Sequence, residues 1–291
     1  MAADEPLSSS LAPQDRPFEI RATPIGYLGA FATRPIPRGT LVLHDRPLFT
    51  LDAPLQAYLF SRAQAGGSGG PTPIEGESDD EDHEPPKDFD AFLDRNIRTV
   101  LKWKTPEQRA DFWDLANTRP DLPQAQAIFA TNAVQTSGEI GGMFLLLSRF
   151  NSSCRPTLSR PAWDPSTAST RLYALRDIAP GEELTWTYLN VTFEFEGVDA
   201  RRDEMRRVFE FECCCPACGP GTMSDDERRA SEKRLLQLRR LKERMAGDVG
   251  SSDEDRAARR ALLGRMAALS REEGLSETAD RLERGLEEKE V

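Results

Sequence analysis

FEFECCCPAC, at residues 209–218, contains four of the chain's five cysteines. Cys213, Cys215 and Cys218 bring three thiolates close together, whereas a tetrahedral structural zinc takes four ligands. Cys214 lies between two of them, and in an extended chain its side chain would point the other way. Cys154 is therefore the predicted fourth ligand of one structural zinc. The alternative is a few buried free cysteines, which are common in protein cores.

The composition describes a globular protein with several loops. The chain has 291 residues, of which 38% are hydrophobic and 30% charged, enough for one core with insertions. It contains no apolar run near the roughly 20 residues that a membrane helix needs. Residues 1–15 lack the basic start and apolar stretch of a secretory signal. We therefore expect the nucleus or the cytoplasm, no membrane partner, and no disulfides among the cysteines.

The charge is unevenly distributed along the chain. The net charge is −11, and seven of the acids lie between Glu75 and Glu84, so the remainder carries only −4. Nothing resembles the basic footprint of a protein that binds nucleic acid directly. The acidic stretch either attracts basic peptides or is a solvated linker.

Strands with tight turns are predicted on both sides of a helical block. Residues 64–87 are rich in Gly, Ser, Pro and acids, which predicts a disordered loop. After it, one helical face and a helix start at Thr105-Pro106-Glu107-Gln108 indicate an insertion. The face consists of Phe89, Phe92, Leu93, Ile97, Val100 and Leu101. Strands are predicted at residues 18–20, 30–33, 40–44, 143–147, 171–175 and 183–188.

The chain from Ser224 onward is predicted to be helical. Leu235, Leu238, Leu241 and Met245 recur every three or four residues, as on the packing face of a helix. Ser-x-x-Glu patterns predict three helix starts. They are Ser224 with Glu227, Ser251 with Glu254, and Ser270 with Glu273.

Four segments together resemble the motifs of a SET domain, in the same order: ATPIGYLGAFATRPIPRGTLV (22–42), LLSRFNSSCRP (146–156), LRDIAPGEELTWTY (175–188) and FEFECCCPAC (209–218). The resemblance is closest to the SMYD-like and related fungal-type branch. It implies a mainly β fold with α elements: a pseudo-knotted core of small sheets, a helical insertion, a post-SET zinc segment and C-terminal helices. It also implies a protein-lysine N-methyltransferase that uses S-adenosylmethionine on histone or other protein lysines.

The resemblance also assigns roles to individual residues. Tyr188 corresponds to the family's active-site tyrosine, and Trp186, Phe193 and Phe195 are candidates for the lysine channel. The alternative for all four is core packing. Positions matching the family's cofactor contacts are Leu28, Gly29, Asn132, Asn151, Ser152, Phe209 and Phe211. For Asn132 the alternative is the end of a helix, and for the two phenylalanines it is plain core.

The sequence departs from the family pattern in two motifs. Tyr27 stands where the family's first loop has a glycine, with Gly26 one position too early. Ser152 and Thr157 replace a histidine and an asparagine of the second motif. The departures support an alternative function, a catalytically impaired SET-like scaffold for protein–protein interaction. A further alternative is a zinc-stabilised adaptor that captures a protein partner on its C-terminal helices.

These patterns predict six segments along the chain: a flexible tail (1–16), the first part of the SET domain (17–51), an insertion in which SET-like sequence resumes near residue 127 (52–142), the second part of the SET domain (143–195), the post-SET zinc segment (196–222) and a C-terminal helical region (223–291). No second Cys/His cluster is present in the sequence, so one zinc is expected.

Overall fold

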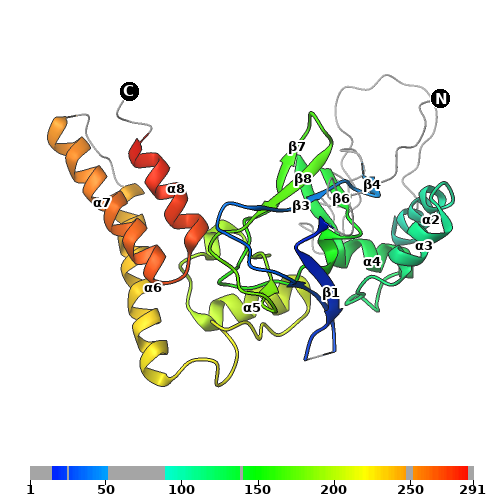
Figure 1. Cartoon of the computed structure of the whole chain (residues 1–291), viewed down its shortest axis with the longest axis horizontal. Coiled ribbons are helices and arrows are strands. Elements are labelled where there is room, and N and C mark those ends of the chain that lie inside the picture. Colours follow the sequence, from blue (N-terminus) through cyan, green and yellow to red (C-terminus); the bar gives the residue numbers. More distant parts are fainter. Residues whose placement is uncertain (1–14, 25, 52–88, 138–139, 247–251, 288–291) are drawn as a thin grey trace. The chain divides into compact units, whose positions relative to one another are not determined.

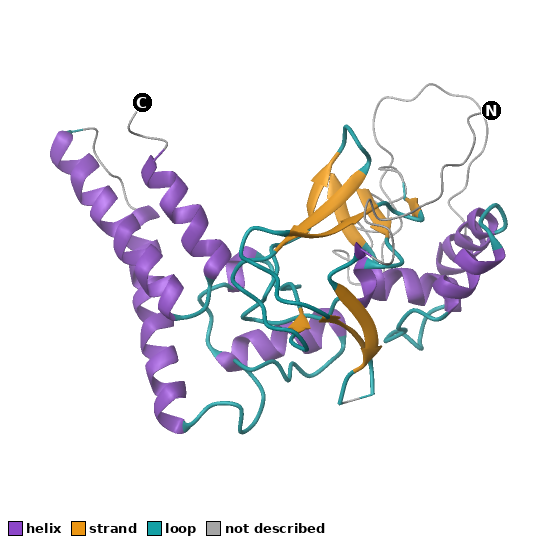
Figure 2. Cartoon of the chain, in the orientation of Figure 1, coloured by secondary structure: helices purple, strands orange, loops and turns teal. Residues whose placement is uncertain are grey.

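The computed structural model describes residues 15–24, 26–51, 89–137, 140–246 and 252–287 (Figures 1 and 2). The strands are β1 (Phe18–Ala22), β2 (Leu28–Ala32), β3 (Leu41–Asp45), β4 (Phe49–Thr50), β5 (Val134–Ser137), β6 (Ile140–Met143), β7 (Ala162–Asp164), β8 (Ser169–Tyr173) and β9 (Glu183–Leu184). The helices are α2 (Phe89–Leu101), α3 (Pro106–Trp113), α4 (Gln124–Asn132), α5 (Val198–Phe209), α6 (Asp225–Ala246), α7 (Asp253–Glu272) and α8 (Ser276–Glu287).

The strands form three small sheets. Their orders are β1-β2-β9, β3-β8-β7 and β4-β6-β5, so each sheet joins strands from distant parts of the sequence. In the first sheet β2 lies between antiparallel neighbours, with Ala30 opposite Leu184 of β9. Three-stranded sheets of this size, together with helices, match the expected mixture of β and α structure.

The chain divides into two compact units. One contains Leu43–Arg149 and Ala162–Arg171, and the other contains Arg16–Val42, Phe150–Pro161 and Leu172–Val291. The predicted segment limits at 51/52 and 142/143 lie inside the first unit. They therefore remain predictions about the sequence and do not describe separately packed bodies.

The first unit has an aromatic and aliphatic core under α2, α3 and α4. Leu93, Ile97 and Leu101 of the predicted helical face are buried in it. The Phe49 ring stacks on Phe129 with ring centroids 5.9 Å apart. Thr105 caps α3 in the predicted capping box with Gln108.

Three strand predictions were too long. The stretch expected as a strand at 143–147 contains only the end of β6 at Met143, and a 3₁₀ turn begins at Leu147. β8 ends at Tyr173 and β9 at Leu184, although strands were expected to reach residues 175 and 188. Beyond those ends the backbone pairs through isolated bridges, which apolar alternation alone does not distinguish from a continuous strand.

Helices α6, α7 and α8 lie side by side in the second unit (Figure 1). Leu235 and Leu238 of α6 are fully buried, and Leu241 joins them. Burying one such side chain stabilises the fold by roughly 1.5–3 kcal/mol. The predicted start of α6 is confirmed, because Ser224 and Glu227 exchange hydrogen bonds.

Of the other two predicted helix starts, the helix expected at Ser251 begins one residue later, and the start expected at Ser270 was wrong. Residue 251 lies outside the described part, and the capping box of α7 is formed one position later, by Ser252 with Asp255. Ser270 lies inside α7, where it is fully buried, and Glu273 ends that helix. The break comes at Gly274, whose φ of 77° is left-handed.

The acidic loop predicted at 64–87 and most of the predicted tail also lie outside the described residues. Within the described ranges, no helix is long and apolar enough to cross a membrane.

Candidate functional site

The four predicted zinc ligands meet in one buried cluster. The Sγ atoms of Cys154, Cys213, Cys215 and Cys218 all lie within 4.8 Å of one another. The Cys154 Sγ lies 3.9 Å from that of Cys213 and 3.5 Å from that of Cys218. A tetrahedron with Zn–S bonds of about 2.3 Å has sulfur atoms about 3.8 Å apart, whereas a disulfide needs about 2.05 Å. The cluster therefore has the dimensions of a tetrathiolate metal site.

A tight turn positions the three clustered cysteines. The amides of Cys218 and Gly219 both donate to the carbonyl of Cys215, at 2.9 and 2.8 Å. A side chain at Gly219 would contact the carbonyl of Cys214 at 3.0 Å, which favours glycine at this position. Cys214 is exposed, as the alternation predicted, and its thiol lies 3.5 Å from the Glu212 carbonyl. Cys214 is therefore not part of the cluster.

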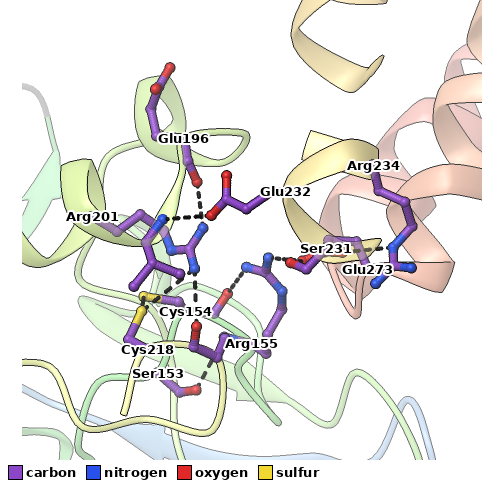
Figure 3. Close-up of polar contacts among 12 residues, drawn as sticks. Ser153, Cys154, Arg155, Glu196, Arg201, Cys218, Ser231, Glu232, Arg234 and Glu273 are labelled. Carbon is purple, nitrogen blue, oxygen red and sulfur yellow. Dashed lines mark hydrogen bonds and ion pairs between the residues drawn. The ribbon is translucent and has the colours of Figure 1, made fainter. Parts of the chain in front are cut away.

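Arg201, a residue that the sequence analysis missed, borders the cluster (Figure 3). It is 1% exposed, and its Nη2 lies 3.6 Å from the Cys218 Sγ and 3.3 Å from the Ala217 carbonyl. Its Nη1 donates to the Glu196 carbonyl. A zinc ion held by four thiolates would have a net charge of −2, which this buried guanidinium would partly balance.

The thiols of the cluster differ in acidity. Hydrogen bonds from the thiols of Cys154, Cys213 and Cys218 hold the pKa of Cys215 far below its ordinary value. The same kind of contact lowers the pKa of Cys218 to about 7, with Cys154 and Cys213 as the main partners. Hydrogen bonds to the other three thiols, together with burial, raise the pKa of Cys154, and the pKa of Cys213 is raised as well despite its contact with Cys154. A metal ion that requires thiolates would therefore displace protons from the cluster on binding.

A second cluster of predicted residues lies where two chain segments run side by side. Ser152 pairs with Trp186 in a parallel bridge. The Trp186 amide donates to the carbonyl of Asn151, and the Ser153 amide donates to that of Trp186, at 3.2 and 3.0 Å. Ser152 Oγ also accepts from the Tyr188 amide at 3.1 Å. We call this pairing the crossing, because the resemblance implies a pseudo-knot in which the loop holding Asn151 and the segment ending at Tyr188 thread past each other.

Tyr188 is held at the end of this crossing by a hydrogen bond and by other rings. Its hydroxyl donates to the Phe150 carbonyl at 2.8 Å. Its ring centroid lies 4.7 Å from that of Trp186, 5.3 Å from Phe209 and 6.5 Å from Phe211. Burial, with a smaller contribution from the Glu183 charge, raises the pKa of Tyr188 well above its usual value. The hydroxyl therefore stays protonated at neutral pH.

Asn151 joins this crossing to β2. Its Nδ2 donates to the Leu28 carbonyl at 3.1 Å and to Glu183 Oε1 at 2.8 Å. A Cβ atom on Gly29 would lie 2.7 Å from Glu183 Oε1 and 2.9 Å from Asn151 Nδ2. A side chain at this position would have to displace the ends of these two side chains, which favours glycine at Gly29. Glu183 itself was not predicted, and only its position in the GEELTWTY stretch could have indicated it.

The departures from the family pattern are accommodated locally. Gly26, with φ of 89°, takes the left-handed conformation, whereas Tyr27 does not, and its side chain is 62% exposed. The turn is closed by the Thr23 amide, which donates to the Tyr27 carbonyl at 2.6 Å. Thr157 is buried, and its hydroxyl accepts from the Thr185 amide at 2.8 Å. The backbone of Tyr27 is therefore outside the left-handed region, and the buried hydroxyl of Thr157 is paired.

Three other candidates lie elsewhere. Asn132 belongs to the first unit, at the end of α4, and its Nδ2 donates to the carbonyls of Ala116 and Ile128, at 2.7 and 2.8 Å. Phe193 packs at the edge of the core around the cysteines. Phe195 is buried among the leucines of α6, which favours the alternative of core packing for this residue.

The chemistry of this region suits a cofactor with an aromatic base and an amino-acid part, such as S-adenosylmethionine. Phe209 and Phe211 are partly buried and offer ring faces, and the side chain of Leu28 is 40% exposed. The indole Nε1 of Trp186 is buried and has no hydrogen-bond partner in the described part of the chain. An unpaired buried donor costs free energy, and a bound ligand could supply its acceptor.

Comparison with known proteins gives a family match. The family model "SET domain" matches residues 27–189, more than half of the chain. A protein of Schizosaccharomyces pombe described as "Histone-lysine N-methyltransferase set5" is 32% identical over 147 residues, 50% of this chain and 43% of that protein. The mouse (Mus musculus) "Protein-lysine N-trimethyltransferase SMYD5" is 31% identical over 94 residues, 31% of this chain and 22% of that protein. The chain therefore matches less than half the length of these relatives.

Solved structures with SET domains also align with the chain. One is the SET domain of LSMT bound to lysine and AdoHcy, with 12% identity, a TM-score of 0.39, and coverage of 96% of this chain and 88% of that chain. Another is Rubisco LSMT bound to AdoMet, with 14% identity, a TM-score of 0.34, and coverage of 96% and 89%.

Proposed function

The chain belongs to the SET-domain family, and from this premise we propose that it is an S-adenosylmethionine-dependent protein-lysine N-methyltransferase. The observation that carries the proposal is the placement of Tyr188. Its protonated hydroxyl is held by the Phe150 carbonyl beside the rings of Trp186 and Phe209. Histones or other proteins with an accessible lysine are the proposed substrates, and the names of the relatives support this class.

In this proposal the residues around the crossing hold the cofactor, whose sulfonium supplies the methyl group. Leu28, Gly29, Asn151 and Ser152 would face its amino-acid part, and Phe209 and Phe211 would flank its adenine. Asn132 of the first unit stays a proposed contact by family position. None of these residues needs to act as a nucleophile, because the reaction mainly requires alignment of the two reactants.

Tyr188 and its neighbours would act on the substrate amine. A lysine side chain in a dry channel has a lowered pKa, because burial disfavours the ammonium form, and the neutral amine is the form that accepts a methyl group. The Tyr188 oxygen and nearby carbonyls can hold a methyl group by weak C–H···O contacts. Trp186 would line the entry of the channel.

We further propose that Cys154, Cys213, Cys215 and Cys218 hold one structural zinc. The same core contains Tyr188, Phe209 and Phe211 at its edge, so the metal would stabilise the aromatic wall of the cofactor site. A structural zinc contributes directly to folding. Metal analysis should give one zinc per chain, and Cys154→Ser should lose it. The exposed Cys214 supplies the control, because Cys214→Ser should keep the metal.

A second candidate function is the scaffold that binds proteins without transferring methyl groups. Both protons of the Asn151 amide are already used by Leu28 and Glu183, and Tyr27 replaces the first glycine of the loop. In that case the C-terminal helices are the proposed protein-binding surface. The proposed location is the nucleus, the cytoplasm or both, and no direct contact with nucleic acid is proposed.

Calorimetric titration of the zinc-loaded protein with S-adenosylmethionine tests the proposal. We expect saturable binding that Asn151→Ala loses and that Asn117→Ala, a change at an exposed asparagine of the first unit, retains. No binding up to millimolar cofactor would exclude the enzyme and favour the scaffold.

A methyl-transfer assay on basic peptides then tests the role of Tyr188. Tyr188→Phe removes only the hydroxyl, and we expect transfer to fall by about 100-fold or more while cofactor binding persists. Tyr173→Phe, at a tyrosine that is 39% exposed on β8, is the matched control and should retain activity. Equal activity of the two variants would contradict the assigned role.

A further inference from the structure

Glu273, at the end of α7, is a buried carboxylate with three partners. Its side chain is 3% exposed and forms an ion pair with Arg155. Its Oε2 accepts from Arg234 Nε at 2.8 Å, and its Oε1 accepts from the Ser231 hydroxyl. Figure 3 shows these side chains converging on Glu273 from α6 and from the loop of Cys154. A carboxylate this deeply buried is costly unless it is paired and hydrogen-bonded, and here both oxygens accept hydrogen bonds.

Arg155 connects this carboxylate to the cysteine cluster. It directly follows Cys154, and its Nη1 donates to the Cys154 carbonyl at 2.7 Å, while its own amide donates to Ser153 Oγ at 3.1 Å. Its Cδ also packs close to Gly274: a Cβ added there would lie 3.3 Å from it. The guanidinium thus connects the backbone of Cys154, a predicted metal ligand, to the corner between α7 and α8, which Glu273 and Gly274 form.

A second set of contacts between this loop and the helices comes from Arg160. The Arg160 amide donates to Glu277 Oε1, in the first turn of α8, at 3.0 Å. Arg160 Nη1 donates to the Leu189 carbonyl, one residue after Tyr188, at 2.6 Å. The corner between α7 and α8 therefore reaches both the loop of Cys154 and the segment of Tyr188.

We propose that Glu273 is a positioning residue, through which the C-terminal helices hold the Cys154 loop in its metal-binding and cofactor-facing conformation. Packing of the helices alone would not require this contact, because their apolar core is formed by Leu235, Leu238 and their neighbours. The inference rests on the proposed zinc site, and through Asn151 and Ser152, three and two residues before Cys154, it extends to the proposed cofactor site.

The test is the rate at which the full chain loses zinc to an excess of a coloured chelator, under native conditions. Glu273→Gln should accelerate release by about 10- to 100-fold, the effect of losing a hydrogen bond between charged groups. Glu283→Gln is the matched control, because Glu283 is exposed and forms its ion pair with Arg271, inside the helical region. It should change the rate less than about threefold.

A double-mutant cycle separates positioning from general loosening. If Glu273 acts through Arg155, Arg155→Gln should accelerate release similarly, and the double variant should be no faster than the faster single variant. Unfolding midpoints measured in parallel show whether release follows global stability. The proposal would be overturned if the rate increases of the two single variants multiplied in the double variant. It would also be overturned if the rate of zinc release changed only in proportion to the loss of global stability.

The outcomes also separate this inference from the proposals on which it rests. A wild-type chain without zinc would remove both the metal site and the positioning role. A wild-type chain with zinc in which Glu273→Gln and Glu283→Gln release it equally would overturn the positioning role alone. The affinity of Glu273→Gln for the cofactor provides a second readout. If the Cys154 loop loses its position, cofactor affinity should fall by about the same factor by which zinc release accelerates.

Discussion

Replacing Arg201 with methionine should weaken the cysteine cluster, although Arg201 is not one of its ligands. Methionine retains most of the buried volume of the arginine but removes its charge and all its donors. Two carbonyls, those of Glu196 and Ala217, would lose their hydrogen bonds, and the Cys218 sulfur would lose the neighbouring guanidinium.

The size of the effect follows from these contacts. Each buried carbonyl left unpaired costs about 1–3 kcal/mol. The attraction between the guanidinium and a thiolate 3.6 Å away is about 4–5 kcal/mol at an effective dielectric constant of about 20, before the cost of burying the charge is subtracted. Breaking a buried ion pair typically costs about 3–5 kcal/mol in total, and this is the destabilisation that we expect for Arg201→Met.

The assay is chemical denaturation of the zinc-loaded protein, followed by helical circular dichroism, together with zinc affinity from competition with a chelator. Arg202→Met is the matched control, because the neighbouring Arg202 forms an exposed ion pair with Glu212 at 3.1 Å. We expect the control to lose less than about 1 kcal/mol. Equal stability and equal zinc affinity of the two variants would refute the argument that Arg201 balances the charge of the site.

Three further changes have expected outcomes. Leu238→Ala should lower the free energy of unfolding, measured by urea denaturation, by about 2–5 kcal/mol, because it opens a cavity among the C-terminal helices. Leu236→Ala, at a position that is 40% exposed on the same helix, should lower it by at most about 0.5 kcal/mol. Gly29→Ala should reduce cofactor affinity in calorimetry by at least about tenfold, because the added Cβ would lie 2.7 Å from Glu183 Oε1 and 2.9 Å from Asn151 Nδ2. Gly264→Ala is the control: its Cβ would have no atom within 4 Å, so affinity should stay unchanged. Burial raises the pKa of Glu273, but the charge of Arg155 and the hydrogen bonds of its partners lower it more strongly, so the pKa is depressed in the folded state. The stability difference between wild type and Glu273→Gln should therefore be complete above about pH 4.3 and shrink as the pH falls through the folded pKa. A stability difference that grows in acid would contradict this sign.

Features that depend on neighbouring residues could be predicted from the sequence. The spacing of Cys213, Cys215 and Cys218 identified the cluster because a short turn brings them together whatever the rest of the chain does. The capping boxes at Thr105 and Ser224 followed from contacts between residues three apart.

Patterns of the same kind misled where burial changed their meaning. Ser270 and Glu273 have the spacing of a capping box, but Ser270 continues the buried stripe of α7 and Glu273 pairs with Arg155, 118 residues earlier. The prediction of a strand at 143–147 was wrong for a related reason. A run of buried apolar residues is equally compatible with the end of a strand followed by a turn, and β6 ends at Met143.

The sequence by itself determined the family, the three closely spaced thiols of the proposed metal site and the amphipathic C-terminal helices, because motifs, ligand spacing and helical periodicity are local properties. Only the tertiary structure decided that Arg201 and Glu273 are buried charges and that Glu183 lies beside Asn151. A charged side chain is buried only when distant partners satisfy it, and no local pattern records which partners those are.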